Sequence, residues 1–415
     1  MSDKQYNFLF IVTDQEYAHQ ALPEGMSLPN RERMKANGVT FANHHTAHTV
    51  CTPSRSTIYT GMHPQHTGMT ENTNFAWASD MSTYIPTIGD MLREAGYYTA
   101  FKGKWHEAEF PAEDTQDAME PYGFSDFQDW GDCYGGPHDG YNVDPRIAAE
   151  ASGWLTTKGV QVADEGQPWY LAVNFVNPHD IMYYDTDGEK SAHTRGMLQI
   201  FDAPDDEIYK AKWDTELPPS FDDDRTQHPP PVEYYKFYTD RACGHVPHDR
   251  RDLWHNHVNY YLNCFRDVDR YIGTVLDALE ESGQAENTII IFTADHGEMG
   301  TAHGLRQKGG VAFKEIVNVP FIVVHPDGPR DATTEAVGSH LDITPTLLSY
   351  AGVSVEERKR RHPQVVGHDL SDVVADPESD GPRGSSENPG SGALMTYDMI
   401  STLSLIHISE PTRLK

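Results

Sequence analysis

The sequence predicts an α/β fold with a mostly parallel central sheet and helices on both faces. Short continuous apolar runs at residues 7–13, 168–176 and 287–294 are typical of strands that are covered on both sides. Segments with helical periodicity lie between these runs, as in chains that form parallel sheets. Polar residues follow directly where the runs end, and ligands bind at this edge of open α/β sheets.

The N-terminal half supplies three expected strands and one helix. The run NFLFIVT ends at Asp14. Residues 86–95, PTIGDMLREA, predict a helix because a proline lies near the first position and Gly96 follows the last. The strand YYTAFKG follows it, and the later run PWYLAVNFV ends at Asn177.

The C-terminal half begins with a long amphipathic helix over residues 253–282. Two strands follow, NTIIIFTA and VPFIVVHP, and the segment SHLDITPTLLSYAG predicts a capped helix that ends at Gly352. The long helix is predicted from apolar residues that recur at spacings of three and four, namely Leu262, Phe265, Val268, Ile272, Val275 and Leu279.

Composition restricts the classes of partner. The 415 residues carry a formal charge of -31, and such a surface repels nucleic acid and anionic membranes. Any site for an anion must therefore contain its own positive charge. No apolar run approaches the roughly 18 residues that a membrane span requires. No secretory signal is expected, so the four widely spaced cysteines indicate reduced thiols and a cytoplasmic location; oligomer formation stays open.

Two long segments, residues 107–145 and 180–250, lack clear periodicity. They are expected to be lids or binding loops, with disordered insertions as the alternative. Their aromatic residues either line an aromatic or cationic pocket or anchor the loops: Trp130, Tyr134, Tyr141, Tyr183 and Tyr184.

Three motifs occur in a consistent order: CTPSRSTIYTG at 51–61, GYYTAFKGKWH at 96–106 and TADHGEMGTAHGLRQKG at 293–309. Together they resemble the signatures of the type I sulfatases, which are formylglycine-dependent enzymes of the alkaline-phosphatase-like superfamily. The resemblance implies hydrolysis of a small sulfate ester to an alcohol and inorganic sulfate, as in arylsulfatases or choline sulfatases.

The resemblance also implies a domain organisation. Residues 1–352 would form the catalytic α/β domain. Residues 353–402 would form a linker and an incomplete C-terminal subdomain, and residues 403–415, with the ending LSLIHISEPTRLK, resemble the translation of a sequencing adapter and are expected to be non-native.

Cys51 is the expected nucleophile precursor. By resemblance, a formylglycine-generating enzyme that reads Pro53 and Arg55 oxidises it to formylglycine, an aldehyde that hydrates to a geminal diol. A helix that starts near Thr52 would direct its free N–H groups at residue 51. Arg55, four residues further on, would share a helical face with Cys51. It is expected to be a catalytic residue that helps to offset the charge of the sulfate. The alternative for a lone cysteine is simple apolar packing.

The expected metal ligands follow two strands. Asp14 and Gln15 follow the first run and Asp295 and His296 follow another, and an oxygen from residue 51 would complete the site for one divalent ion. Oxygen donors favour Ca²⁺, with Mn²⁺ or Mg²⁺ as alternatives because of the histidine. Many sulfatases have aspartate at the position of Gln15, so this chain has less negative charge there.

The remaining catalytic assignments come from the resemblance alone. Lys104 would bind sulfate and a diol oxygen, and His106 would be the base that regenerates the aldehyde. His179 would lie near the leaving-group oxygen, and Lys308 would contact sulfate and leaving group, with Lys314 as a competitor for that role. His303 is expected nearby, without an assigned role.

Other functions remain open at this stage. The metal ligands resemble those of phosphonate monoester and phosphodiester hydrolases of the same superfamily, whereas Lys104 and His106 resemble the sulfatases. A non-catalytic acidic binding protein would keep the fold without the modification. A cofactor-independent phosphomutase would need a Ser or Thr nucleophile and two metals. A zinc site at His44 and His48 is not expected, because no local carboxylate or second cysteine completes it.

Overall fold

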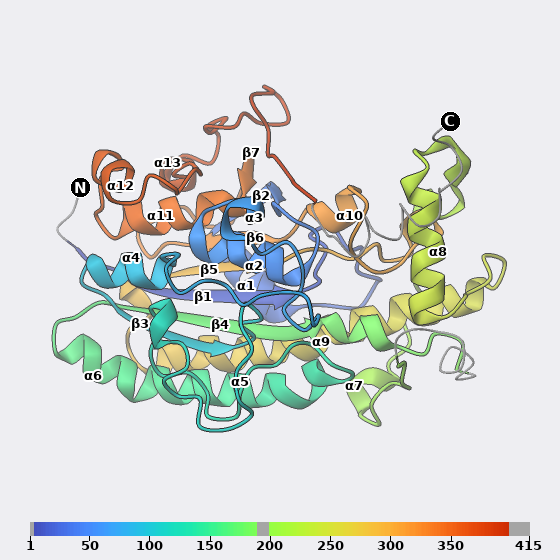
Figure 1. Ribbon diagram of the computed structural model, residues 1–415, viewed down its shortest axis with the longest axis horizontal. Helices are drawn as coiled ribbons and strands as arrows, with labels where there is room; N and C mark the ends of the chain where they lie inside the picture. The colour runs from blue at the N-terminus through green and yellow to red at the C-terminus, as the bar shows by residue number, and fades with distance from the viewer. Residues whose placement is uncertain (1–3, 189–198, 398–415) are drawn as a thin grey trace.

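The computed structural model describes residues 4–188 and 199–397 and contains one seven-stranded sheet (Figure 1). The strand order is β3-β4-β1-β5-β6-β2-β7. Only β6 runs antiparallel to its neighbours among the described strands, so the mostly parallel sheet is confirmed. The strands are β1 (Asn7–Asp14), β2 (Val39–His45), β3 (Tyr98–Gly103), β4 (Trp169–Pro178), β5 (Thr288–Ala294), β6 (Phe321–Val324) and β7 (Ala332–Ser339).

Helices cover both faces of this sheet, as Figure 1 shows. One face is covered by α5 (Asp139–Thr156), α6 (Lys158–Asp164) and α9 (Arg251–Glu281), and the other by α2 (Cys51–Thr60), α4 (Ile88–Glu94) and α11 (Ile343–Tyr350). The other helices are α1 (Pro29–Ala36), α3 (Pro64–Thr67), α7 (Glu207–Lys210), α8 (Pro231–Cys243), α10 (Lys314–Val317), α12 (Val355–Arg361) and α13 (Ser371–Ala375).

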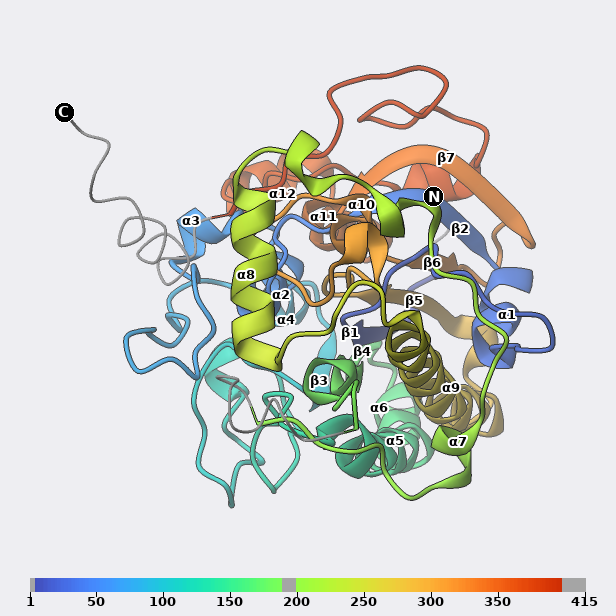
Figure 2. The ribbon, with the colours of Figure 1, turned by 90° about the vertical axis from the view of Figure 1, so that its right-hand side faces the viewer.

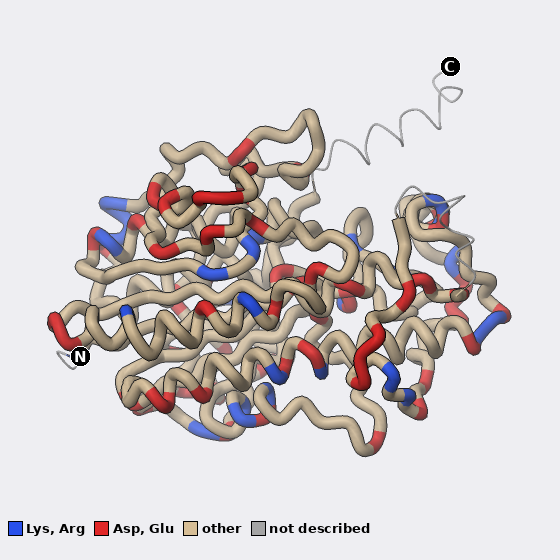
Figure 3. The backbone as a smooth tube through the Cα atoms, turned by 90° about the horizontal axis from the view of Figure 1, so that it is seen from below, with Lys and Arg blue, Asp and Glu red and all other residues tan. Residues whose placement is uncertain are grey.

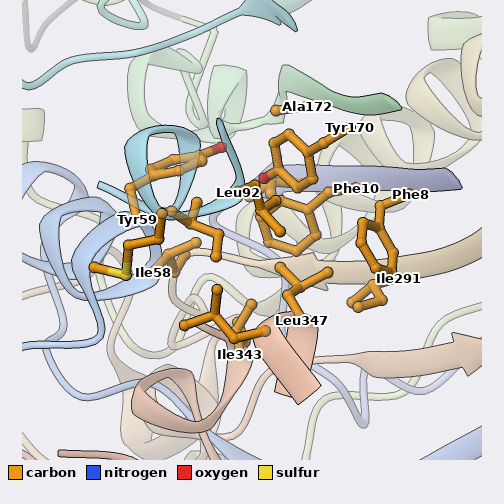
Figure 4. Packing of buried hydrophobic residues seen from close by; sticks show 14 of the residues in the cluster. Phe8, Phe10, Ile58, Tyr59, Leu92, Tyr170, Ala172, Ile291, Ile343 and Leu347 are labelled. Carbon is orange, nitrogen blue, oxygen red and sulfur yellow. The ribbon is translucent and has the colours of Figure 1, made fainter. Parts of the chain in front are cut away.

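Strand β1 shows why its sequence is a continuous apolar run. Phe8 and Phe10 pack among residues of α2, α4 and α11 (Figure 4), whereas Leu9 and Ile11 pack on the side of α5 and α9. Successive side chains of a strand point to opposite faces, and both faces of this strand are buried. A central strand of this kind therefore needs apolar residues at every position.

Local signals fixed several helix ends as expected. The side chain of Thr87 accepts hydrogen bonds from the backbone N–H groups of Gly89 and Asp90, and the carboxylate of Asp90 accepts one from the backbone of Thr87. This capping box starts α4 within the predicted segment. The long helix α9 lies within two residues of its predicted bounds at each end. The last predicted helix begins as a short 3₁₀ turn, His340–Asp342, and continues as α11.

The sequence pattern missed other elements. β2 and β7 were not predicted, and the segment 107–145, expected to be irregular, contains the start of α5. The segment 180–250 contains α7 and α8. Helix α8 lies beyond the carboxyl ends of the strands, as the two ribbon views show together (Figures 1 and 2).

Part of the C-terminal region packs on the main core, whereas residues 386–391 are exposed. Leu370, Val373 and Val374 are buried in the same cluster as Phe8 and Phe10. Residues 403–415 lie outside the described residues. Acidic residues recur along the backbone in Figure 3. Within the described chain no helix is long and apolar enough to cross a membrane.

Core packing gives a stability prediction for Phe10→Ala. Phe10 is 1% exposed and contacts the rings of Tyr59 and Tyr170, so the substitution should leave a cavity and cost about 3–5 kcal/mol. Urea unfolding followed by tryptophan fluorescence measures the loss. Tyr84→Ala is the control, because Tyr84 is 95% exposed and its loss should change stability little. Equal unfolding midpoints for the two variants would contradict this packing.

Candidate active site

Parallel strand pairing brings two carboxylates together at the carboxyl edge of the sheet. Thr13 of β1 pairs with Ala294 of β5, so Asp14 and Asp295 leave the sheet side by side. The first residue of α2, Cys51, lies above them. One potential ligand atom from each of Asp14, Cys51, Asp295 and His296 lies within 4.8 Å of the others, and all four residues are buried.

Arg55 connects the helix to both strands. Its Nε lies 2.9 Å from Oδ2 of Asp295, and its terminal nitrogen Nη2 lies 3.2 Å from Oδ2 of Asp14. Nη1 donates to the backbone oxygen of Lys104 and to the side chain of Asn174. The guanidinium is fully buried, and Arg55 does not line the cavity of about 230 Å³ that opens at the N-terminus of α2. It therefore holds the two carboxylates in place.

Asp14 is surrounded by cations. Its Oδ2 lies 2.6 Å from Nζ of Lys104, and its Oδ1 lies 3.6 Å from Nζ of Lys308. Burial alone would raise the pKa of Asp14, but Lys104, Lys308, His179 and Arg55 hold that pKa well below its usual range. In return, and against its own burial, Asp14 raises the pKa of Lys104. The pair is thus ionised at neutral pH.

The donor set fits one divalent cation. Nδ1 of His296 lies 3.0 Å from the backbone oxygen of Gly297, which leaves Nε2 facing Cys51 at 3.3 Å. The amide nitrogen of Gln15 donates to Glu298 at 2.6 Å, whereas its Oε1 is buried and has no hydrogen-bond partner in the described chain. Carboxylate and amide oxygens beside an imidazole nitrogen suit a hard or borderline divalent ion.

The structure distinguishes between the two candidate lysines. Nζ of Lys308 lies 2.9 Å from Sγ of Cys51, whereas Lys314 is exposed at the start of α10. Burial and Asp14 raise the pKa of the Cys51 thiol, but Lys104, Lys308 and His296 outweigh them and lower it. Lys308 thus lies beside residue 51 and Lys314 does not, while the catalytic role of Lys308 stays a prediction.

A cavity of about 230 Å³ opens at the N-terminus of α2. Cys51, His106, His179 and Lys308 line it, while the fully buried Lys104 and Arg55 do not. Lys308 is the only Lys or Arg, and there is no Asp or Glu, among the lining residues that the structure describes. Aromatic side chains form much of the wall, including Phe75, Tyr134, Tyr183, Tyr234, Tyr235 and Tyr238.

His106 and His179 are neutral imidazoles at this cavity. Burial, followed by the charge of Lys104, holds the pKa of His106 well below its usual value. Burial, followed by Lys308, does the same for His179. Both ring nitrogens of His106 lack hydrogen-bond partners within residues 4–188 and 199–397, so the ring can accept a proton from a bound group.

Comparison with known proteins identifies the family. The model of the Sulfatase family matches residues 6–353, which is most of the chain. The chain belongs to the sulfatase family. This membership supports the activity of a sulfuric ester hydrolase.

Curated relatives of this sulfatase cover most of its length. It is 28% identical to an uncharacterized sulfatase, YidJ, of Escherichia coli, over 85% of this chain and 69% of the relative. It is 26% identical to a Delta 4,5-hexuronate-2-O-sulfatase of Bacteroides thetaiotaomicron, with coverage of 87% and 74%. It is also 26% identical to a choline-sulfatase of Rhizobium meliloti, with coverage of 86% and 70%.

Solved structures confirm the fold. A 2-O GAG sulfatase superposes with a TM-score of 0.69 at 22% identity, over 90% of this chain and 75% of that chain. A phosphonate monoester hydrolase of Silicibacter pomeroyi superposes with a TM-score of 0.66 at 21% identity, over 91% and 78%. The sulfatase thus shares the alkaline-phosphatase-like architecture with enzymes of both kinds.

Of the five loop aromatics predicted as pocket or anchor residues, two line the cavity of the sulfatase, namely Tyr134 and Tyr183. The other three act as anchors. Tyr184 stacks on Tyr260, Tyr141 packs on Tyr209, and Trp130 lies under the guanidinium of Arg146 and donates to Glu150.

Histidines outside the catalytic group have other surroundings. The ring of His44 stacks on Phe321 at 4.0 Å, and that of His48 stacks on Tyr397 at 5.3 Å. Neither belongs to a potential metal-binding group in the part of the chain that the structure describes. His303 does not line the cavity; its Nδ1 lies 2.9 Å from Asp223.

Three residues that position the site were missed from the sequence. Glu298 accepts the amide of Gln15, and Asn174 accepts from Arg55. Asp132 accepts hydrogen bonds from the backbone N–H groups of Trp105 and His106. Burial raises the pKa of Asp132 to about 6. Glu298 follows the Asp-His pair within the third motif, and this position was a usable signal. Asn174 and Asp132 lie outside the three motifs, so no signal in the sequence indicated them.

The contact between Gln15 and Glu298 gives a testable prediction. In Gln15→Glu, two carboxylates would meet where one hydrogen bond now spans 2.6 Å, so metal-free protein should lose about 3 kcal/mol of stability. The double variant with Glu298→Gln restores one donor and should recover most of that loss. Thermal unfolding in EDTA measures both variants. Equal melting temperatures for parent and Gln15→Glu would refute the contact.

Proposed function

We propose that this sulfatase hydrolyses a sulfate ester through a formylglycine formed from Cys51, together with one divalent cation. The observation that carries the proposal is the position of Cys51 at the N-terminus of α2, within 4.8 Å of donors from Asp14, Asp295 and His296 and 2.9 Å from Lys308. Sγ of Cys51 stands in for the oxygen that formylglycine would present. A formylglycine-generating enzyme is the partner this maturation requires, and a cytoplasmic location remains our prediction.

Asp14, Gln15, Asp295 and His296 would hold the cation, together with the modified residue 51. Three of them offer oxygen, which favours Ca²⁺ over Mn²⁺ or Mg²⁺. When bound, the cation and the formylglycine supply a hydrated aldehyde acidic enough to act as the nucleophile. The chain's own task is to orient these ligands, and Arg55 does so through its two ion pairs.

The protein also supplies the positive charge that a sulfate ester needs. Lys308 faces the cavity, and Lys104 lies behind Asp14, so both offset the charge of the transferred group. His106, whose ring nitrogens are free of other partners in the described chain, would take the proton that leaves when the aldehyde is restored. Lys308 would protonate the departing alcohol, and His179, which is held neutral, would lie beside the leaving-group oxygen; both residues line the cavity.

The cavity wall favours a neutral organic part. Its single lysine is next to residue 51, where the sulfate would bind. The rest of its described lining is uncharged and largely aromatic, and it includes the two neutral histidines. A substrate with further anionic groups would need more cations than these residues provide. An aryl sulfate meets these conditions, because its ring can pack on the tyrosines of α8.

The second candidate is a phosphonate monoester or phosphodiester hydrolase. One structural neighbour with a TM-score of 0.66 is a phosphonate monoester hydrolase, and such substrates carry the same single charge as a sulfate ester. A non-catalytic binding role is the third, and it would leave Cys51 as an unmodified thiol.

We expect the enzyme matured in its native cells to turn over 4-nitrophenyl sulfate with a higher kcat/KM than bis(4-nitrophenyl) phosphate or 4-nitrophenyl phenylphosphonate. Both comparisons use one leaving group, so the difference reports the preference for the transferred group. A higher kcat/KM for either phosphorus ester would replace the sulfatase proposal with the second candidate.

The modification itself is tested by mass spectrometry of the peptide that contains Cys51, from protein produced in its native cells. The mass should correspond to formylglycine. Cys51→Ser should release at most one equivalent of 4-nitrophenol per chain and then stop, because a serine ester has no second hydroxyl to expel sulfate. An unmodified thiol in an active enzyme, or repeated turnover by Cys51→Ser at the parent rate, would reject this route.

A further inference from the structure

A second group of potential metal ligands lies outside the catalytic site. Asp223, His228 and His303 each offer one ligand atom, and these atoms lie within 4.8 Å of one another. Asp223 and His228 flank the short 3₁₀ turn Arg225–Gln227, and His303 belongs to the 3₁₀ turn Ala302–Gly304 after β5. The group therefore joins segments that are far apart in the chain.

Asp223 and His303 approach each other without a hydrogen bond. Nδ1 of His303 lies 2.9 Å from Oδ2 of Asp223, yet within the described residues this nitrogen has no hydrogen-bond partner. The side chain of His303 is 11% exposed, so water covers little of it. Two polar atoms that are close but not directed at each other leave their lone pairs free for a shared third atom.

Neighbouring residues fix the orientation of the imidazoles. The ring of His303 stacks on Phe313 at 4.1 Å, and the ring of His228 lies edge-on to both, at 5.2 Å and 5.4 Å. Arg225 donates to the backbone oxygen of His303 at 3.1 Å. His303 adopts a left-handed backbone with φ of 56°, which is uncommon for a residue other than glycine. Rigid imidazoles are what a metal site requires.

We propose that Asp223, His228 and His303 bind one zinc ion. Two imidazoles and one carboxylate are a common set of three protein ligands for Zn²⁺, with water in the fourth position. Ligand atoms about 2 Å from a tetrahedral ion lie about 3.3 Å apart, so atoms of this group, now within 4.8 Å of one another, would draw closer when the ion binds. Two imidazoles also favour zinc over the Ca²⁺ or Mg²⁺ that an oxygen-rich site selects.

The zinc ion would link α8, which forms part of the cavity wall, to the catalytic loop, by which we mean the segment from Asp295 to Lys308. His228 lies just before α8, whose tyrosines line the cavity, and His303 lies in the loop that leads to Lys308. A hydrogen bond from Tyr235 of α8 to the backbone of Arg306 already joins the two segments. Zinc would reinforce this join and restrain Lys308 relative to the aromatic wall. None of the three zinc ligands belongs to the proposed catalytic group, so the existence of the zinc site does not depend on the proposed sulfatase function.

The test compares zinc bound per chain in the parent protein and three variants. Full-length protein is stripped with EDTA, dialysed against Zn²⁺, and analysed by inductively coupled plasma mass spectrometry. His228→Gln and His303→Asn should each bind one equivalent less than the parent; asparagine is chosen because it tolerates positive φ. Zinc held by the catalytic ligands is common to all samples, so the difference reports the second group.

His245→Gln is the matched control. His245 pairs with Asp240 of α8 at 2.8 Å, but it is exposed and belongs to neither ligand group. It should bind as much zinc as the parent. Zn²⁺ should also raise the melting temperature of His245→Gln more than that of His228→Gln, because one more ion binds only the folded state.

Equal zinc content in the parent and a folded His228→Gln, checked by circular dichroism, would overturn the site. Loss of the same equivalent in His245→Gln would do so too, because it would show unspecific histidine binding. Turnover of 4-nitrophenyl sulfate is measured separately on the parent, so failure of the zinc site and failure of the sulfatase proposal are distinguished.

Discussion

The buried ion pairs of Arg55 are the interaction on which the site depends. Asp14 and Asp295 leave adjacent parallel strands, and two buried carboxylates this close repel each other unless a cation separates them. Arg55 pairs with both carboxylates from within α2. Its charge therefore offsets their repulsion and also fixes the position of the helix against the two strands. Removing one partner from a buried pair costs about 3–5 kcal/mol, because the remaining charge is left uncompensated. The position of Cys51 follows from this helix.

The active site contains clustered positive charge, although the molecule as a whole is strongly negative. The chain carries a formal charge of -31, which opposes the approach of any anion. Within the described site, three cations, Arg55, Lys104 and Lys308, face the two carboxylates of Asp14 and Asp295. Among the groups in direct contact with Asp14 and Asp295 the balance is positive before a divalent ion is counted, and burial reduces its screening by water. The composition predicted that an anion site would need this local excess.

The sequence predicted those parts of the fold whose signal is local. Continuous apolar runs identified β1, β4 and β5, and periodicity identified α9, because each pattern lies within one segment. Strand β2 ends in the polar stretch Asn43–His45, so its sequence, VTFANHH, lacks a buried strand's pattern. The antiparallel direction of β6 could not be predicted either, since side chains alternate in the same way in both directions.

The site was predictable to a similar degree. Motif residues at strand ends converge because parallel strands end at one edge, which the sequence could indicate. The ion pairs of Arg55 with Asp14 and Asp295 were not predictable. A motif gives the spacing of residues along one helix, but it does not say which residues of other segments they contact. The contribution of α8 to the cavity was missed because the contact between that helix and the catalytic loop is non-local, as in the bond from Tyr235 to Arg306.

Glu298 explains why this chain can have glutamine at position 15. One oxygen of Glu298 accepts the amide of Gln15, and the other accepts the backbone N–H of Gln307, next to Lys308. Despite its burial, hydrogen bonds and the charge of His257 lower the pKa of Glu298, so it is a carboxylate that needs donors. An aspartate at position 15 would offer none. The amide keeps one oxygen for a cation while its nitrogen satisfies Glu298, so a single buried carboxylate sets both a metal ligand and the lysine that faces the cavity.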